Sequence, residues 1–209
     1  MSPDSLPAPD LAFYQYANLD SRGPQRFLLV GNGMPAQIVF GHISDRGHAV
    51  GWADGNKLIG ALHYSPFTWL LNINSTIIYD DRVLGVFAGQ ALNMHPAPLP
   101  EYSGLHCHYW AIKHHKKEWA ATVHFMDMGI DTGDIAAVRV IPIEEADTPQ
   151  SLFIKTMVAG AKLMCYVVDD ILSGKPLARH PQDLSKRRVY TRRMAAADGW
   201  QPAIDELTR

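Results

Sequence analysis

The chain has 209 residues, of which 47% are hydrophobic and 19% charged, with a formal net charge of −2. This composition allows one domain of ordinary size with a sizeable core, and the charge gives no electrostatic reason to expect a nucleic-acid or anionic-membrane partner. The two cysteines, Cys107 and Cys165, lie far apart and form neither a disulfide framework nor a CxxC metal knuckle, which favours a cytoplasmic protein.

Residues 1–25 are interpreted as an arm outside the main fold. They are polar, contain several prolines and lack the basic start and apolar run of a signal peptide. No stretch of the chain approaches the roughly 18 apolar residues of a membrane span. Phe13, Tyr14 and Tyr16 are expected to anchor the arm to the surface or to a second subunit, and the arm therefore suggests a homodimer.

Strand and helix patterns alternate in the first half of the main domain, which is expected over residues 26–180. Short apolar runs predict strands at 27–30, 49–53, 67–73 and 91–95, and helices are predicted at 35–47 and 80–87. The alternation predicts an α/β fold with a Rossmann-like, open, mostly parallel sheet and helices on both faces. Little room remains between Asp54 and Phe67, so this half is expected to be shortened.

The second half continues with a proline-containing loop and a further set of elements. Helices are predicted at 104–114 and 148–172, where Gly174 stops the second helix, and strands at 120–126 and 135–140. Residues 181–209 are basic at their start and are interpreted as an irregular tail that lies on the domain.

Two polar segments stand out at the expected strand ends. Asn93 and His95 end one strand, and Asp131 lies in a glycine-containing loop that ends at Asp134. In open α/β sheets, sites form beyond the carboxyl ends of the strands, so an amide, an imidazole and a carboxylate are expected to converge in one crevice.

This trio is suited to acyl transfer. The amide of Asn93 can donate a hydrogen bond to a developing oxyanion, and His95 can pass a proton or, when protonated, stabilise the oxyanion. Asp131 can orient the imidazole directly or through water. The residues alone also fit a structural role, since an Asn-x-His strand end and an Asp in a turn are common.

The two segments resemble the formyltransferase family. Residues 92–104 read LNMHPAPLPEYSG and residues 122–135 read TVHFMDMGIDTGDI. The family pattern is Asn-x-His-Pro, then Leu-Pro-x-Tyr-x-Gly, then Gly-(Leu/Ile/Val)-Asp-Thr-Gly-Asp-Ile, in this order and at this spacing. The resemblance covers roughly residues 67–172, and the family includes glycinamide ribonucleotide, methionyl-tRNA, sugar-amine and siderophore or peptide formyltransferases.

The resemblance implies a role for each matching residue. Asn93, His95 and Asp131 match the catalytic trio, and the co-substrate implied is 10-formyltetrahydrofolate. The residues expected to bind it are Ile77, Ile78, Tyr79, Met126, Asp127, Met128, Gly129, Ile130 and Asp134. In the family, the bond that matches Leu99–Pro100 is often cis. The tail around Gln182, Arg187 and Tyr190 resembles that of the tRNA, sugar and siderophore branches.

The branch implied is transfer of a formyl group to a primary amine of a small metabolite, such as an amino sugar, an amino acid derivative or a peptide or siderophore precursor. The basic extra domain of the tRNA enzymes is not seen in this chain. Three alternatives remain open: a hydrolase that releases formate from the same folate, an enzyme like the glycinamide ribonucleotide formyltransferases, and a folate-binding module without catalysis.

Several other side chains are kept out of the predicted catalytic set. His106, His108, His114 and His115 cluster around Cys107, and a metal site there is the less favoured interpretation, since the family needs no metal. His106 or His108 could instead contact the acceptor, because this helix is expected to border the pocket. Cys107 is not interpreted as a nucleophile. His124 is expected to be a satisfied structural histidine, and the basic run from Lys186 to Arg193 a solvated face.

Overall fold

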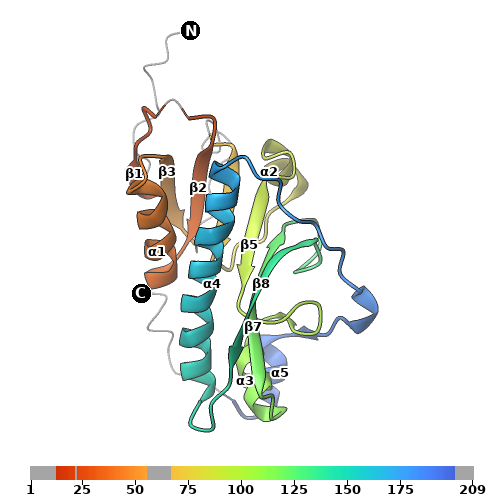
Figure 1. Ribbon diagram of the computed structural model, residues 1–209. Helices are drawn as coiled ribbons and strands as arrows, with labels where there is room; N and C mark the ends of the chain where they lie inside the picture. Colours follow the sequence, from red (N-terminus) through yellow and green to blue (C-terminus); the bar gives the residue numbers. More distant parts are fainter. Residues whose placement is uncertain (1–12, 22, 56–66, 201–209) are drawn as a thin grey trace.

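The computed structural model describes residues 13–21, 23–55 and 67–200, and its centre is a seven-stranded sheet (Figure 1). The strand order is β1-β3-β2-β4-β5-β7-β8. Strands β2 to β5 run parallel, β1 and β7 run antiparallel to their neighbours, and β8 is antiparallel to β7, so that five of the seven strands share one direction. The strands are β1 (Phe13–Ala17), β2 (Arg26–Gly31), β3 (Ala49–Asp54), β4 (Trp69–Ile73), β5 (Ala91–His95), β7 (Glu118–Phe125) and β8 (Ile135–Pro142).

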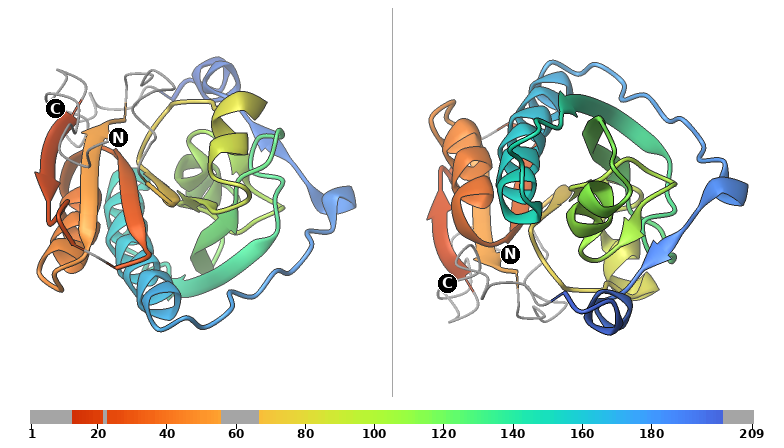
Figure 2. Two further views of the ribbon diagram at one scale, coloured as in Figure 1. Left: turned by 90° about the horizontal axis from the view of Figure 1, so that it is seen from above. Right: turned by 90° about the horizontal axis from the view of Figure 1, so that it is seen from below.

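Helices cover both faces of the sheet (Figure 2). Helices α1 (Gly33–Ser44) and α4 (Pro149–Leu172) lie side by side on one face, where they contact the alternate β2 residues Phe27 and Leu29. The other face of β2, with Leu28 and Val30, packs near α2 (Asp81–Val86). This alternation is why β2 is apolar from Phe27 to Val30, as expected of a parallel strand buried on both faces.

Helix α4 is the long helix of the core. It begins with a capping box, in which Thr148 accepts from the backbone N–H of Ser151 and the Ser151 hydroxyl accepts from that of Thr148. By length and composition α4 could cross a membrane, which corrects the expectation that no stretch is long and apolar enough. However, 61% of its most apolar 18-residue window is buried inside the protein, as in the core helix of a globular domain.

The arm and the tail are more ordered than expected. Residues Phe13–Ala17 form β1, which pairs antiparallel with β3 at the sheet edge, so this part of the expected arm belongs to the main sheet. The tail was wrongly expected to be irregular. It contains a 3-10 turn (Leu184–Lys186), strand β9 (Val189–Tyr190) and helix α5 (Arg192–Ala197).

The helix expected at 104–114 is shorter than predicted. Helix α3 covers Cys107–Lys113, because Ser103–Gly104 instead form strand β6, which pairs in parallel with β9. Gly104 has a φ of +90°, outside the range of a helix. The other predicted elements are confirmed with shifts of a few residues. Most of the stretch between Asp54 and Phe67 lies outside the described residues, and the division at residues 25 and 180 stays a prediction.

Candidate active site

Strand register aligns three polar side chains across the sheet. Parallel pairing of β4 with β5 places Asn72 beside Asn93, and antiparallel pairing of β5 with β7 places Asn93 opposite His124. The side chains are joined by hydrogen bonds: Asn72 Nδ2 donates to Asn93 Oδ1 at 2.8 Å, and Asn93 Nδ2 lies 3.0 Å from His124 Nε2. Tyr79 extends the row, because its hydroxyl donates to Asn72 Oδ1 at 3.0 Å.

The row fixes the orientation of the Asn93 amide. His124 Nδ1 lies 2.8 Å from the carbonyl oxygen of Phe125, which can only accept, so Nδ1 carries the proton and Nε2 accepts from Asn93. At the other end, the Tyr79 hydroxyl fixes Asn72, which in turn donates to the Asn93 oxygen. One N–H of Asn93 therefore remains free of the row and can be donated to a bound group.

His95 is the last residue of β5, and its ring is buried, with 4% exposure. Its Nε2 lies 2.6 Å from the carbonyl oxygen of Tyr102, so Nε2 carries a proton and Nδ1 is the basic atom of the neutral ring. Burial lowers the pKa of His95 below its ordinary value, although the nearby Asp131 opposes this shift. The imidazole is accordingly neutral at neutral pH and able to accept a proton.

Asp131 faces both imidazoles. Its Oδ1 lies 3.6 Å from His95 Nδ1 and 3.6 Å from His124 Nε2, and its Oδ2 accepts the backbone N–H of Gly104 at 2.7 Å. Burial alone would raise the pKa of this carboxyl, but His95, His124 and the Gly104 N–H outweigh it and hold the pKa below its usual range. Asp131 is therefore a carboxylate, placed to stabilise a proton on His95 Nδ1.

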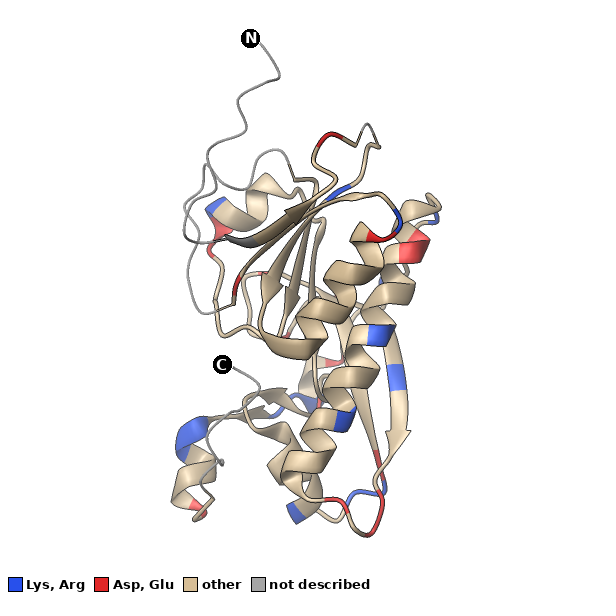
Figure 3. Cartoon of the chain, turned by 90° about the vertical axis from the view of Figure 1, so that its left-hand side faces the viewer, with Lys and Arg blue, Asp and Glu red and all other residues tan. Residues whose placement is uncertain are grey.

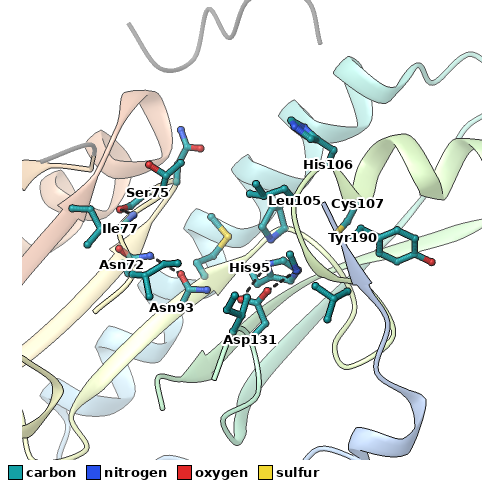
Figure 4. A pocket seen from close by; sticks show the side chains of 18 of the residues that line it. Asn72, Ser75, Ile77, Asn93, His95, Leu105, His106, Cys107, Asp131 and Tyr190 are labelled. Carbon is teal, nitrogen blue, oxygen red and sulfur yellow. Dashed lines mark hydrogen bonds and ion pairs between the residues drawn. The ribbon is translucent and has the colours of Figure 1, made fainter. Parts of the chain in front are cut away.

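A cavity of about 420 Å³ opens onto this trio (Figure 4). The structure brings all three predicted catalytic residues into its lining, together with eight of the nine residues expected to bind the co-substrate: Ile77, Ile78, Tyr79, Met126, Asp127, Met128, Gly129 and Ile130. The ninth, Asp134, is not in the lining, and its carboxylate lies 3.9 Å from the guanidinium of Arg179. The expected cis geometry of the Leu99–Pro100 bond is confirmed.

Several side chains outside the predicted catalytic set also line the cavity, among them His106, Cys107 and His108. Within the part of the chain that the structure describes, no three His, Cys, Asp or Glu side chains are placed to hold one metal ion. Burial raises the pKa of the Cys107 thiol far above its ordinary value, and its sulfur lies 3.3 Å from the Tyr102 carbonyl, so it is not a thiolate nucleophile.

Sequence reasoning missed Asn72, which orients Asn93 and which no local motif distinguishes from a core polar residue. The expectation that His124 is a satisfied structural histidine is confirmed, because both of its ring nitrogens have hydrogen-bond partners. Strand register was the missing information, because pairing two strands in register is what places these side chains together. Trp200 also lines the cavity, where its ring lies 4.9 Å from that of His106.

Fold and geometry thus define the class of protein. It is an open α/β protein in which an amide, a buried imidazole and a carboxylate converge in an arrangement that suits acyl transfer. Residues 75–168 match the family described as Formyl transferase. This segment, which carries Asn93, His95 and Asp131, is similar to the formyltransferase family.

Known relatives agree with this family and differ in their acceptors. The chain is 36% identical over 115 residues to methionyl-tRNA formyltransferase of Azobacteroides pseudotrichonymphae, a match that covers 54% of this chain and 34% of that protein. It is 44% identical over 64 residues to the trifunctional purine biosynthetic protein adenosine-3 of Drosophila melanogaster, covering 31% of this chain and 5% of that protein. These matches span much less than two thirds of either relative.

Solved structures share the fold at low identity. A formyltransferase from Anoxybacillus kamchatkensis, in complex with a UDP-linked formamido sugar and tetrahydrofolate, superposes with a TM-score of 0.74 at 19% identity, covering 88% of this chain and 94% of that one. An N-formyltransferase from Helicobacter canadensis, in complex with folinic acid and dTDP-3-aminofucose, gives a TM-score of 0.71 at 18% identity, covering 81% and 71%. Because some sequence relatives are tRNA enzymes, excluding a nucleic-acid partner on charge alone is not supported.

Proposed function

We propose that this protein is an N-formyltransferase that moves the formyl group of 10-formyltetrahydrofolate to a primary amine of a small metabolite. The observation that carries the proposal is the convergence of Asn93, His95 and Asp131 in one cavity. The solved neighbours bound to folinic acid or tetrahydrofolate support the choice of co-substrate.

The cavity has two ends that suit the two substrates. Residues Ser75–Tyr79 and Met126–Ile130 line the cavity, and the expected pterin pocket consists of parts of these two segments. Ser75 and Ile77 lie on one side of the cavity and His106 lies on the other (Figure 4). Exposed backbone in these segments can pair with the polar edge of a pterin, while Ile77 and Met126 supply apolar walls. The other end, lined by His106, His108, Phe153 and Trp200 among others, is left for the amine.

The residues around the cavity favour a neutral amine. Asp127 and Asp131 are the carboxylates among its described lining residues, and Asp131 already accepts from the Gly104 N–H and faces His95 and His124. An amine must attack in its neutral form, and loss of water in the cavity lowers the pKa of the amine towards that form.

The chemistry follows from the protonation states already assigned. The amine nitrogen attacks the formyl carbon, and the free N–H of Asn93 donates to the oxygen as negative charge develops on it. His95 Nδ1 takes a proton from the attacking nitrogen, and Asp131 stabilises the imidazolium that forms. Collapse of the tetrahedral intermediate breaks the bond to the folate nitrogen N10, which receives the proton, leaving a formamide and tetrahydrofolate.

The acceptor is the finer part of the proposal. A cavity of about 420 Å³ suits a small amine together with part of a folate, and the solved neighbours bound to sugar nucleotides favour an amino sugar. Lys and Arg residues are spread over several elements of the chain, as are Asp and Glu residues (Figure 3). We therefore place a small amine ahead of aminoacyl-tRNA.

The test is the absorbance change as 10-formyltetrahydrofolate becomes tetrahydrofolate, measured with a panel of amino sugars, amino acids and methionyl-tRNA and without any amine. Acceleration by a small amine, with a formylated product seen by mass spectrometry, is the expected result. Turnover that releases formate without an amine would favour the hydrolase, and turnover with methionyl-tRNA alone would overturn the small-molecule acceptor.

Two histidine substitutions, one in the site and one outside it, provide a matched test. His95→Ala is expected to lower turnover by about two to four orders of magnitude with folate binding largely intact, because the lost group is the proton acceptor. His42→Ala removes a histidine of α1 that pairs with Asp169 at 2.7 Å and does not line the cavity, and should retain turnover. Near-normal turnover in His95→Ala contradicts the mechanism.

A further inference from the structure

The tail runs past the candidate active site, and Val189–Arg192 line the cavity. In the following, the strap is the segment His180–Tyr190, which runs along the outside of the molecule after α4 (Figures 1 and 2). It is joined to the sheet at its start, where His180 and Ile135 exchange backbone hydrogen bonds of 2.9 and 3.0 Å. This places the strap next to the loop that carries Asp131.

Two strap side chains hold the backbone of that loop. Gln182 Nε2 donates to the carbonyl oxygen of Asp131 at 3.0 Å and to that of Gly133 at 2.6 Å. Arg187 Nη2 donates to the carbonyl oxygen of Ile130 at 2.7 Å. Three carbonyls within four residues are thus fixed by side chains about 50 residues away in the sequence.

The loop needs such support. Asp131 has a φ of +56°, in the left-handed region that costs a residue with a side chain of order 1 kcal/mol or more. A residue keeps this conformation only when its surroundings fix it. Gln182 binds the carbonyl of Asp131 itself and that of Gly133, two residues further on, so its bonds act on the main-chain conformation that aims the Asp131 carboxylate at His95.

The strap also contacts the main chain on the His95 side of the His95–Asp131 pair. Its last two residues form β9, which pairs with β6. The ring of Tyr190 stacks on that of Tyr102 at 5.3 Å, and the carbonyl of Tyr102 accepts from His95. Gly104 of β6 donates its N–H to Asp131. The same segment therefore contacts both the loop that carries Asp131 and the main chain that binds His95.

We propose that Gln182 is a positioning residue for the reaction, which acts from the strap by holding Asp131 in the left-handed conformation that faces His95. The role rests on the proposed function for its effect on turnover, but its structural part does not. The other polar atom of Gln182, Oε1, is buried without a hydrogen-bond partner in the described residues, so its contribution comes from the two N–H donations.

The Gly104 amide gives a direct readout of Asp131. Its charge-assisted hydrogen bond to the carboxylate shifts the amide proton downfield and protects it from exchange. In Gln182→Leu, which keeps bulk but has no donor, we expect this proton to move upfield and to exchange at least about tenfold faster. Asp131→Asn supplies the reference position for an amide that has lost its carboxylate partner.

A second variant and a control keep the test decisive. Gln182→Glu replaces the donor by an acceptor facing two carbonyls and should give the same shift with little change in shape. Asp183→Ala alters the neighbouring residue, whose carboxylate binds Ser185 and Lys186 within the strap, and should leave the Gly104 amide unchanged.

Kinetics add a readout that a merely structural role would not move. We expect kcat of the Gln182 variants to fall by about 10- to 100-fold, with KM for the folate changed by less than about threefold, because a misplaced carboxylate affects the transition state and not folate binding. An unchanged Gly104 amide in both folded Gln182 variants overturns the proposal. A shifted amide in a protein with no formyl transfer supports the positioning role and counts against the proposed function.

Discussion

His108 allows a quantitative prediction about stability. Its ring has 7% exposure and packs against Phe153 and Trp200, with ring centroids 4.8 and 5.6 Å away. Burial, with a smaller contribution from His106, lowers its pKa from 6.5 to about 3. The folded protein therefore keeps this ring neutral at pH values where the unfolded chain protonates it.

The direction and size of the change in stability with pH follow from this difference in the pKa of His108. Below pH 6.5 the unfolded state binds a proton that the folded state does not, so stability falls as the pH drops from 6.5 towards about 3. At pH 5, which is 1.5 units below the unfolded value, the loss is about 2 kcal/mol at ~1.36 kcal/mol per unit. This figure changes little for any folded pKa below about 4, because the folded ring is then mostly neutral at pH 5.

The assay is urea unfolding at about pH 7.5 and about pH 5, with wild type and His108→Leu. Other histidines titrate in both proteins, so the informative quantity is the difference between their losses of stability. Wild type should lose about 2 kcal/mol more than the variant on acidification. Equal losses would refute the reasoning, because they would mean that His108 gains a proton as readily in the folded protein as in the unfolded chain.

Three other substitutions test separate parts of the structure. Asp131→Asn should lower kcat by about two to four orders of magnitude and move the acid limb of its pH profile to lower pH, because the carboxylate raises the pKa of His95. Gly104→Ala should lower the free energy of unfolding by about 2 kcal/mol or more in urea titrations, since its φ is +90° and the added Cβ would lie 2.2 Å from the Tyr190 carbonyl oxygen. Thr148→Ala removes the N-cap of α4 and should reduce the melting temperature, at a cost of about 1 kcal/mol.

Much of the fold could be predicted because its elements carry local signals. The buried parallel strands are continuous apolar runs, and α4 has a capping box and a proline at its start. The errors occurred where pairing partners are distant in the sequence. Strand β1 forms against β3, and β9 forms against β6, and neither pairing can be deduced from a segment of two to five residues.

The site also contains residues with local sequence signals and residues whose roles depend on distant pairing. Asn93, His95 and Asp131 lie in contiguous motifs and could be identified before the structure was known. Gln182 belongs to the tail resemblance, but its two bonds to the Asp131 loop depend on the path of the strap. Asn72 depends on the parallel register of β4 with β5, which no single strand encodes. Residues that position others are therefore the hardest to find from sequence.

Two separate supports hold the trio. The row from Tyr79 to His124 fixes the Asn93 amide through strand register, whereas the strap fixes Asp131 through main-chain carbonyls. They meet where His124 Nε2 lies 3.6 Å from Asp131 Oδ1, too far for a direct hydrogen bond. The oxyanion donor can therefore remain aligned while the acid–base pair is disturbed. If the proposed function holds, a change in the tail segment should therefore affect proton transfer without disturbing the sheet contacts that orient the Asn93 amide.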